Sequence, residues 1–413
     1  MTKLTKNRWV VLGILFSFMM ILSISMIGCG GGGGENPPAM TRCVGNPPPE
    51  GCYTTIQSAI DASNAGDTII VHAGDYQENV VVDRRVELKT AGDGDVTIQA
   101  QDAYQDVITI ERAGSNSIIA GFNIFGGDDG ITLNSAENCI ISGNIVEHHL
   151  EHGIVLIQSH HNEITNNTVS GVVEGQIVGI RLDHSNNNTI TMNEVPYNKL
   201  NGIFLYVSSG NQVNGNSISF TDGDGIGLLS SNNNEIADNS VTNSNFTGIV
   251  IEQSSRNIIT GNKVSDNEGL PGIGIILVGA SGDESNNNLI ENNQVERISA
   301  FGIVLIYAGD NEIIHNRITN VLMDGIVMDD DTLNTKITGN TITDNDVGIH
   351  IVSDGAVGNS AHNNNILSNS SWGVSNEAAV QFDATLNYWG PEGPDGQTSG
   401  NVTVEPWLTN PIQ

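Results

Sequence analysis

A short hydrophobic motif returns along most of the chain at nearly constant spacing. In each copy a glycine is followed by an aliphatic residue, a variable residue and a second aliphatic residue, as from Gly153 to Leu156. Successive copies lie 23 to 28 residues apart and begin at Gly130, Gly153, Gly179, Gly202, Gly225, Gly248, Gly274, Gly302, Gly325, Gly348 and Gly373. A period of this length predicts a stack of similar structural units.

A second motif, Asn-x-Ile/Val-x-x-Asn-x-Ile/Val, fills the stretch between the glycine motifs, beginning for example at Asn162, Asn188 and Asn211. Apolar and polar residues alternate in both motifs, and β-branched residues are frequent, which predicts strands rather than helices. Each repeat therefore contains three short β-segments. Identical segments at a fixed period pair most simply with their own copies in the next coil, in parallel register about 4.8 Å away.

The asparagines are expected at the corners of the coils, where they tolerate left-handed backbone and can form hydrogen bonds from coil to coil. We therefore predict an all-β fold, a single right-handed parallel β-helix of about a dozen coils. Open coils at its ends would expose apolar interior and unpaired edges. A capping box from Thr54 to Gln57 predicts a short N-terminal capping helix, and Tyr388, Trp389 and Trp407 are expected to cover the last coil.

The N-terminus has the pattern of a secretion signal. Basic residues precede an apolar stretch from Trp9 to Met20, and the segment from Met26 to Cys29 resembles the lipobox of bacterial lipoproteins. This resemblance implies that Cys29 is acylated, and that the lipid attaches the protein to the membrane. Because Gly30 is not aspartate, the resemblance points to the outer membrane. The alternative is an uncleaved membrane anchor, since the apolar run is just long enough to span a bilayer.

These features divide the chain into five segments. They are a lipoprotein signal peptide (1–28), a flexible tether (29–42), an N-terminal cap with the first strands (43–84), the β-helix repeats (85–385) and a C-terminal cap (386–413). Cys43 and Cys52 bracket a proline-rich loop and are expected to form a disulfide in an oxidising compartment. Cys139 is expected to be a small buried hydrophobic residue.

Over residues 85 to 385 the repeats resemble the pectate-lyase-like superfamily, and most closely the NosD-type β-helix repeats. The resemblance implies the fold and says little about activity. NosD-type proteins are linked with copper handling, so the resemblance also permits copper as a cofactor without supplying ligands.

Composition narrows the range of partners. The chain has 15 Lys and Arg against 47 Asp and Glu, a net charge of -32. Nucleic acid is excluded as a partner, because phosphate binding needs basic surface. An acidic polysaccharide would be repelled unless a cation bridged it.

The strands that carry the glycine motif are expected to have an unusual outer face. Their outward positions are largely apolar, namely Val155, Ile157, Phe204, Tyr206, Val250, Ile276, Val278, Val304 and Ile306. A stripe of this extent predicts a cover, which is a loop, a second copy of the chain in a homo-oligomer, or a ligand. For a polysaccharide ligand, Phe204 and Tyr206 would supply flat apolar surface, with Asn201 and Asp224 beside them as hydrogen-bonding groups.

The same face carries candidate catalytic groups. Asp106, Asp129 and His152 precede the glycine position in successive coils, and Arg181 points outward one coil further on. Carboxylates with a histidine and an arginine suit acid–base cleavage of a glycosidic bond. Asp129 and His152 match a fragment of the polygalacturonase pattern, whose other motifs are missing. The alternative is that aspartate is simply the usual turn residue before glycine.

Two groups of residues are candidate metal ligands. The histidines of two neighbouring coils suit a transition metal such as copper, namely His148, His149, His160 and His161, with His152 and His184 close by. Asp324, Asp329, Asp330 and Asp331 suit Ca²⁺, which prefers clustered carboxylates. For the aspartates the alternative is a solvated acidic corner.

Three functions follow from these features. The first is an envelope-anchored lipoprotein that binds polysaccharide at the cell surface or in the periplasm. The second is a polysaccharide hydrolase or lyase that uses Asp106, Asp129, His152 and Arg181. The third is a NosD-like accessory protein that handles copper. The sequence leaves open whether the protein is an enzyme.

Overall fold

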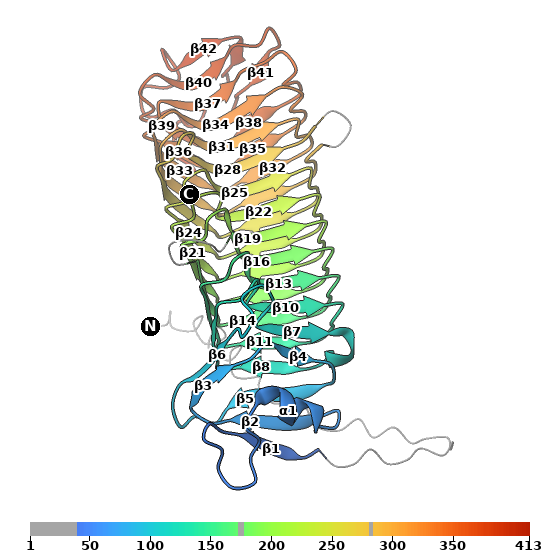
Figure 1. Ribbon diagram of the computed structural model, residues 1–413. Helices are drawn as coiled ribbons and strands as arrows, with labels where there is room; N and C mark the ends of the chain where they lie inside the picture. Colours follow the sequence, from blue (N-terminus) through green and yellow to red (C-terminus); the bar gives the residue numbers. More distant parts are fainter. Residues whose placement is uncertain (1–38, 172–176, 281–283) are drawn as a thin grey trace, which may run out of the picture. The chain divides into compact units, whose positions relative to one another are not determined.

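The computed structural model describes residues 39–171, 177–280 and 284–413, and these residues form one stack of β-coils (Figure 1). Three parallel sheets of 16, 14 and 13 strands run along the stack. The described chain is thus an all-β solenoid, slightly longer than the dozen coils expected. The predicted parallel pairing of each segment with its copy in the next coil is confirmed.

The 14-stranded sheet contains the glycine motifs, and we call it the glycine sheet. Its strands are β4 (Val80–Val82), β7 (Ile108–Glu111), β10 (Ile131–Asn134), β13 (His152–Ile157), β16 (Val178–Asp183), β19 (Asn201–Tyr206), β22 (Ile226–Leu229), β25 (Thr247–Glu252), β28 (Ile273–Val278), β31 (Phe301–Ile306), β34 (Asp324–Asp329), β37 (Val347–Ile351), β40 (Trp372–Asn376) and β42 (Thr398–Gly400).

The other two sheets carry the two halves of the asparagine motif. In one coil, β13 is followed by β14 (Glu163–Thr165) of the 16-stranded sheet and β15 (Thr168–Ser170) of the 13-stranded sheet. Their inward side chains, such as Leu156, Ile164 and Val169, are 0% exposed. The aliphatic positions of consecutive repeats therefore stack directly into one continuous core.

The glycines of the repeated motif are required by close packing at the start of each glycine-sheet strand. A Cβ added at Gly202 would lie 2.8 Å from the carbonyl oxygen of Gly225 in the next coil and still closer to the side chain of Ile218. Such contacts are too short for carbon, so any larger residue would push neighbouring coils apart.

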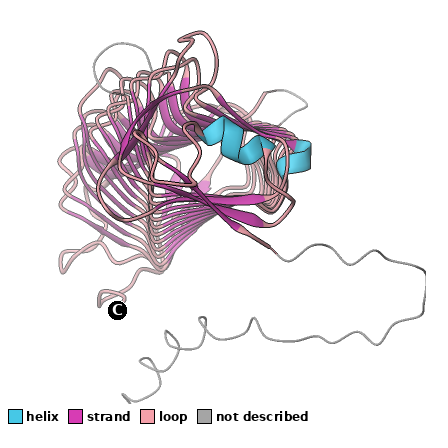
Figure 2. Ribbon diagram, turned by 60° about the horizontal axis from the view of Figure 1, so that its bottom comes forward, coloured by secondary structure: helices cyan, strands magenta, loops and turns pink. Residues whose placement is uncertain are grey.

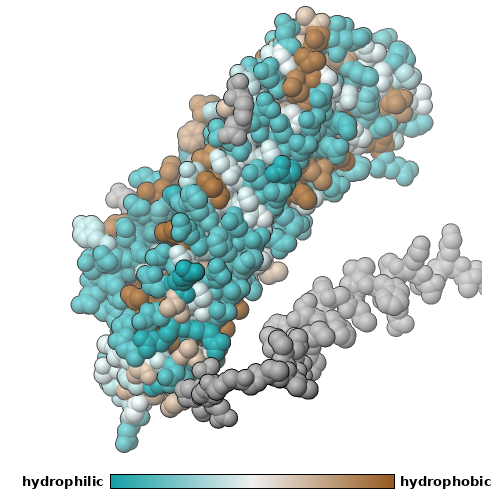
Figure 3. Space-filling model, turned by 90° about the vertical axis from the view of Figure 1, so that its right-hand side faces the viewer, coloured by the Kyte–Doolittle hydropathy of each residue, from teal (hydrophilic) through white to brown (hydrophobic). Residues whose placement is uncertain are grey.

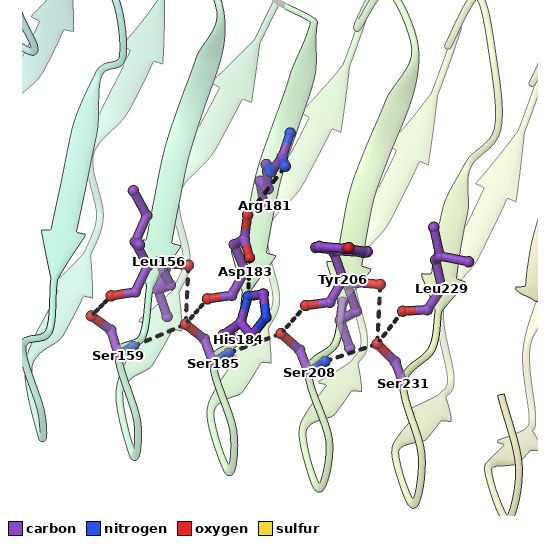
Figure 4. Close-up of polar contacts among 12 residues, drawn as sticks. Leu156, Ser159, Arg181, Asp183, His184, Ser185, Tyr206, Ser208, Leu229 and Ser231 are labelled. Atoms are coloured by element: carbon purple, nitrogen blue, oxygen red, sulfur yellow. Dashed lines mark hydrogen bonds and ion pairs between the residues drawn. The ribbon is translucent and has the colours of Figure 1, made fainter. Parts of the chain in front are cut away.

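Asparagine ladders hold the corners, as predicted. The backbone N–H and the Nδ2 of Asn193 both donate to Oδ1 of Asn216, at 2.9 and 3.0 Å, and Asn216 repeats this pattern with Asn239. This ladder contains Asn144, Asn167, Asn193, Asn216, Asn239, Asn262, Asn293, Asn316, Asn340, Asn364 and Asn387. A second ladder runs from Asn162 to Asn311. A serine ladder with Ser159, Ser185, Ser208 and Ser231 lies where the glycine-sheet strands end (Figure 4).

The corner before each glycine-sheet strand also contains buried polar residues, among them Ser244, Asn267 and Asn345. His149 stands at the equivalent position of its coil. It is 1% exposed, and neither ring nitrogen has a hydrogen-bond partner. Burial lowers the pKa of His149 to about 4, so the imidazole is neutral inside the coil.

The N-terminal coil is covered by the short helix α1 (Ile56–Asp61), which lies at the near end of the stack in Figure 2. The predicted helix is confirmed, but its start was wrong by one residue. Thr55, not Thr54, is the N-cap, and its side chain accepts from the backbone N–H of Ser58 at 3.2 Å. The carboxylate of Glu78, which is distant in sequence, accepts hydrogen bonds from the backbone N–H groups of Ile56 and Gln57.

The boundaries of the caps differ from those expected. β1 (Thr41–Val44) already pairs with β2 (Asp67–Val71), so sheet structure begins inside the proposed tether. At the other end, β42 and β43 (Val402–Thr403) extend two sheets into the proposed cap. Trp389 is 2% exposed in the core, with Trp407 packed against the same core.

Cys43 and Cys52 form a disulfide, and Cys139 is a buried thiol.

The signal peptide and Cys29 lie outside the described residues. Among the described residues, no helix has the length and apolar character needed to cross a bilayer. On the side of the stack seen in Figure 3, hydrophilic residues dominate and hydrophobic ones form small, separate patches.

Removing one ladder asparagine should destabilise the coil strongly. Asn216→Ala would leave the buried N–H and Nδ2 of Asn193 without their acceptor, at a cost of about 3 kcal/mol in unfolding free energy. The exposed Gln212→Ala, one strand away, should cost less than about 0.5 kcal/mol. Denaturant unfolding of both variants measures this, and equal stabilities would contradict the structural role of the ladder.

Replacing His149 with asparagine should remove part of the pH dependence of stability. The unfolded chain protonates this histidine near pH 6.5, whereas the folded chain does so only near pH 4. The stability contributed by neutral His149 is therefore present above pH 6.5 and is lost as the pH falls towards 4, with a slope of about 1.4 kcal/mol per pH unit. Unfolding of wild type and His149→Asn from pH 7 to 4.5 tests this, and parallel curves would contradict it.

Candidate functional site

The outer face of the glycine sheet brings three of the predicted catalytic residues into one row, and Arg181 lies in the next coil, three positions further along its strand, where it pairs with Val155. The pairing of Ile131 with Ile108 and with Ile154 continues to the positions two residues earlier, so that Asp106, Asp129 and His152 occupy successive coils. Side chains at equivalent positions of adjacent strands lie about 5 Å apart. The period of the repeated motif therefore places these three residues in neighbouring coils.

Asp129 holds His152 through two hydrogen bonds. Its Oδ1 accepts from the backbone N–H of His152 at 2.8 Å and lies 2.9 Å from the Nδ1 of the imidazole. On the other side of the ring, Nη1 of Arg181 lies 3.4 Å from Nε2. A proton on Nδ1 satisfies both contacts, because Asp129 then accepts and Nε2 presents a lone pair to the guanidinium.

Two further residues extend this row towards the far end of the strand. Nη2 of Arg181 donates to Asp183 at 3.3 Å, and the other carboxylate oxygen of Asp183 pairs with His184 (Figure 4). Sequence analysis missed Asp183, although it stands two residues after Arg181 and alternation places both on the outer face. The result is one polar chain, Asp129–His152–Arg181–Asp183–His184, across three coils.

Asp106 differs from its neighbours in its electrostatics. Burial raises the pKa of Asp106, and the charge of Asp129 raises it further, while Thr109 donates to its carboxylate at 3.2 Å. A carboxyl group with a raised pKa can hold a proton for transfer. Asp106 is thus the group best suited to act as an acid in this row.

The residues predicted to bind a sugar gather on β19 and the strand that follows. Gly227 is buried and has no side chain, and a Cβ placed there would lie 3.0 Å from both the Phe204 ring and the Asn201 amide. Nδ2 of Asn201 donates to Asp224 at 3.4 Å, and burial raises the pKa of Asp224. An aromatic ring and polar groups therefore surround Gly227.

The apolar stripe is only partly a free surface. Towards the C-terminal half, Ile273, Val304 and Val327 are 8%, 5% and 7% exposed and form their own cluster outside the coil. Ile276, Phe301, Ile306 and Val352 pack against this cluster. Neighbouring strands therefore cover much of the stripe themselves, whereas Ile157 is 40% exposed.

The candidate metal ligands do not converge. Among the described residues, no group of three or more His, Cys, Asp or Glu side chains could hold a metal ion. His148 packs against Phe125 at 4.6 Å between ring centroids, His149 is inside the coil, and Nδ1 of His160 accepts the N–H of Asn186. His161 is exposed at a left-handed corner. These histidines are close in sequence, but the corner turns their side chains in different directions.

The acidic candidates for Ca²⁺ are separated as well. Asp324 begins β34 and Asp329 ends it, about 16 Å away along the strand, followed by Asp330 and Asp331 in the turn. Asp324 instead holds Nδ1 of His350 at 2.9 Å, and this contact raises the pKa of His350. Sequence analysis missed His350, whose outward position one coil after Asp324 was the available signal.

A polar hollow of about 290 Å³ lies at the turns that follow the glycine-sheet strands. It is lined by Arg112, Ser135, Glu137, Gln158, His160 and His184. His184 connects this hollow to the polar chain on the sheet, since it pairs with Asp183.

Comparison with known proteins identifies the architecture. Residues 201–366 match the family model described as a right handed beta helix region, and residues 55–219 match that of the periplasmic copper-binding protein NosD. Among the described residues, no group of side chains is arranged to hold the copper of that description. A cell surface glycoprotein of Methanothermus fervidus is 35% identical over 103 residues. That match covers 24% of this chain and 17% of the length of the glycoprotein.

Two solved structures share the fold at low identity. The periplasmic alginate epimerase AlgG is 15% identical, with a TM-score of 0.53, over 82% of this chain and 83% of that one. The A-module of the Azotobacter vinelandii mannuronan C-5 epimerase AlgE4 is 17% identical, with a TM-score of 0.51, over 86% and 94%. The family matches and this similarity show the fold of the chain, a right-handed parallel β-helix.

Proposed function

We propose that the protein binds a neutral polysaccharide on the outer face of the glycine sheet, at the surface of the cell envelope or within it. The observation that carries this proposal is the arrangement of Phe204, Asn201 and Asp224 around the side-chain-free position of Gly227. Sugar recognition needs a flat apolar surface and hydrogen-bonding groups at its rim, and both are present here.

Charge selects the class of sugar. The chain carries a net charge of -32, and Asp106, Asp129, Asp183 and Asp224 lie on or beside this face. An acidic polymer would approach against this field, whereas a neutral one would not. The alginate and mannuronan epimerases share the architecture, and their activity does not transfer to this chain at 15–17% identity.

A specific observation also favours a second function, cleavage of the bound neutral polymer by hydrolysis. In this mechanism Asp106 donates a proton to the leaving oxygen, and His152, oriented by Asp129, takes a proton from the attacking water. Arg181, whose Nη1 lies 3.4 Å from Nε2 of His152, would help to hold the imidazole in position. The polar chain from Asp129 to His184 supports this candidate.

An envelope location agrees with the periplasmic description of the NosD model and with the cell surface glycoprotein. We further propose that acylation of Cys29 anchors the protein to the outer membrane. The lipid would hold the solenoid at the membrane through the glycine-rich stretch after Cys29.

Phe204→Ala combined with Tyr206→Ala should weaken glycan binding about tenfold, because two aromatic surfaces are lost. The solenoid should remain folded, since both side chains point outward. Binding to an array of neutral and acidic polysaccharides measures this, with Thr189→Ala on a different sheet as the control. Unchanged binding would place the glycan site elsewhere.

Asp129→Asn and His152→Ala should each abolish turnover if the protein is an enzyme, while leaving binding nearly intact. The asparagine keeps an acceptor for the N–H of His152 but removes the charge that stabilises the protonated imidazole. Product analysis by chromatography, with each glycan that binds, tests this. A wild-type protein that binds a glycan and never shortens it would contradict the cleavage function and leave the binding function.

A further inference from the structure

Two aromatic rings are stacked at the corner that precedes the glycine sheet. The rings of Tyr197 and Phe220 have centroids 5.2 Å apart and planes inclined by 10°. Their side chains remain 53% and 49% exposed. The pair is therefore an apolar surface that the fold leaves half uncovered.

These rings stand at equivalent positions of consecutive coils. The N–H of Tyr197 donates to the carbonyl of Ser219, just before Phe220, and the N–H of Phe220 donates to that of Thr242, just before Asn243. Tyr197, Phe220 and Asn243 all have left-handed backbone, with φ of 59°, 55° and 56°. Other coils have His148, Asp266, Arg297, Asn320, Asp344 and Ser368 at the equivalent corner, where His148 contacts the ring of Phe125.

The conformation of this corner does not favour aromatic residues. Left-handed backbone is unfavourable for bulky side chains and least so for asparagine and aspartate, which several other coils use here. Half-exposed rings also gain little from burial. The stability of the coil would thus be served better by asparagine, so this pair is better explained by a ligand than by folding.

The position of the pair connects it to the sugar site. Tyr197 is four residues before Asn201 and Phe220 four residues before Asp224, so the pair borders the two coils that supply those polar groups. Two half-exposed rings offer about 200 Å², far below the roughly 800 Å² per partner of a stable protein interface. One or two sugar rings need only a surface of this size.

We propose that Tyr197 and Phe220 form a second subsite for the same glycan, one that stacks a neutral β-linked sugar with equatorial hydroxyls. The faces of such a sugar ring carry only C–H groups, which pack on aromatic surface. This inference rests on the proposed function and adds the class of sugar. It also predicts that the bound glycan runs from the outer face of the glycine sheet across the corner that precedes this sheet.

The test compares three full-length proteins by calorimetric titration with cellohexaose. They are the wild type, the double variant Tyr197→Asn/Phe220→Asn and the double variant Phe204→Ala/Tyr206→Ala. Asparagine is the residue of the neighbouring corner at Asn243, so the first variant suits the backbone. We expect its affinity to fall about tenfold, and its thermal midpoint to equal or exceed that of the wild type.

The other outcomes separate this inference from the proposed function. Unchanged affinity of Tyr197→Asn/Phe220→Asn, with weakened binding by Phe204→Ala/Tyr206→Ala, would overturn the second subsite and keep the first. Binding of other glycans but not of cellohexaose by the wild type would overturn the sugar class alone. A thermal midpoint lowered by more than about 5 °C would show that the pair is structural packing. A wild type that binds no glycan would overturn both proposals.

Discussion

The asparagine ladders are the constraint on which the rest of the structure depends. Each buried amide oxygen accepts two hydrogen bonds from the preceding asparagine, as Asn216 does from Asn193, so one coil cannot shift against the next without breaking both. Parallel strands of three residues have few backbone bonds of their own to fix their register. The ladders fix it instead, from Asn144 to Asn387.

A fixed register separates the inside of the solenoid from its surface. Inside, the same amides, aliphatic residues and glycines must return in every coil, because their partners are their own copies. Outside, each position faces solvent and is free to vary. The outward side chains of the glycine sheet therefore differ along the solenoid, from the polar chain of Asp129, His152 and Arg181 to the apolar cluster around Val304, while the inward residues of the coils stay the same.

This separation explains how much could be predicted from the sequence. Strict alternation and a constant period leave little freedom, so the fold, the ladders and the row of Asp106, Asp129 and His152 followed directly. The corners were less predictable, because there one residue points inward and the next outward. For this reason His149 is buried while His148 packs against Phe125, and a cluster of histidines in sequence is not a cluster in space.

Contacts between distant segments were also beyond prediction. Glu78 caps α1 across 22 residues, and this favoured Thr55 over Thr54 as the N-cap. His350 meets Asp324 across 26 residues, and only a comparison of the outward positions of neighbouring coils would have found this contact. The stacking of Tyr197 on Phe220 could have been found by comparing equivalent corners of successive coils, because a common register makes such residues neighbours.

The central claim is that the common register of the coils creates one continuous binding surface on the glycine sheet and on the corner that precedes it. A crystal structure of the full-length protein with cellohexaose tests it most directly. The account predicts sugar density beside Phe204, Asn201 and Asp224 that continues to Tyr197 and Phe220. Density confined to another sheet, or to the hollow beside His160 and His184, would contradict it.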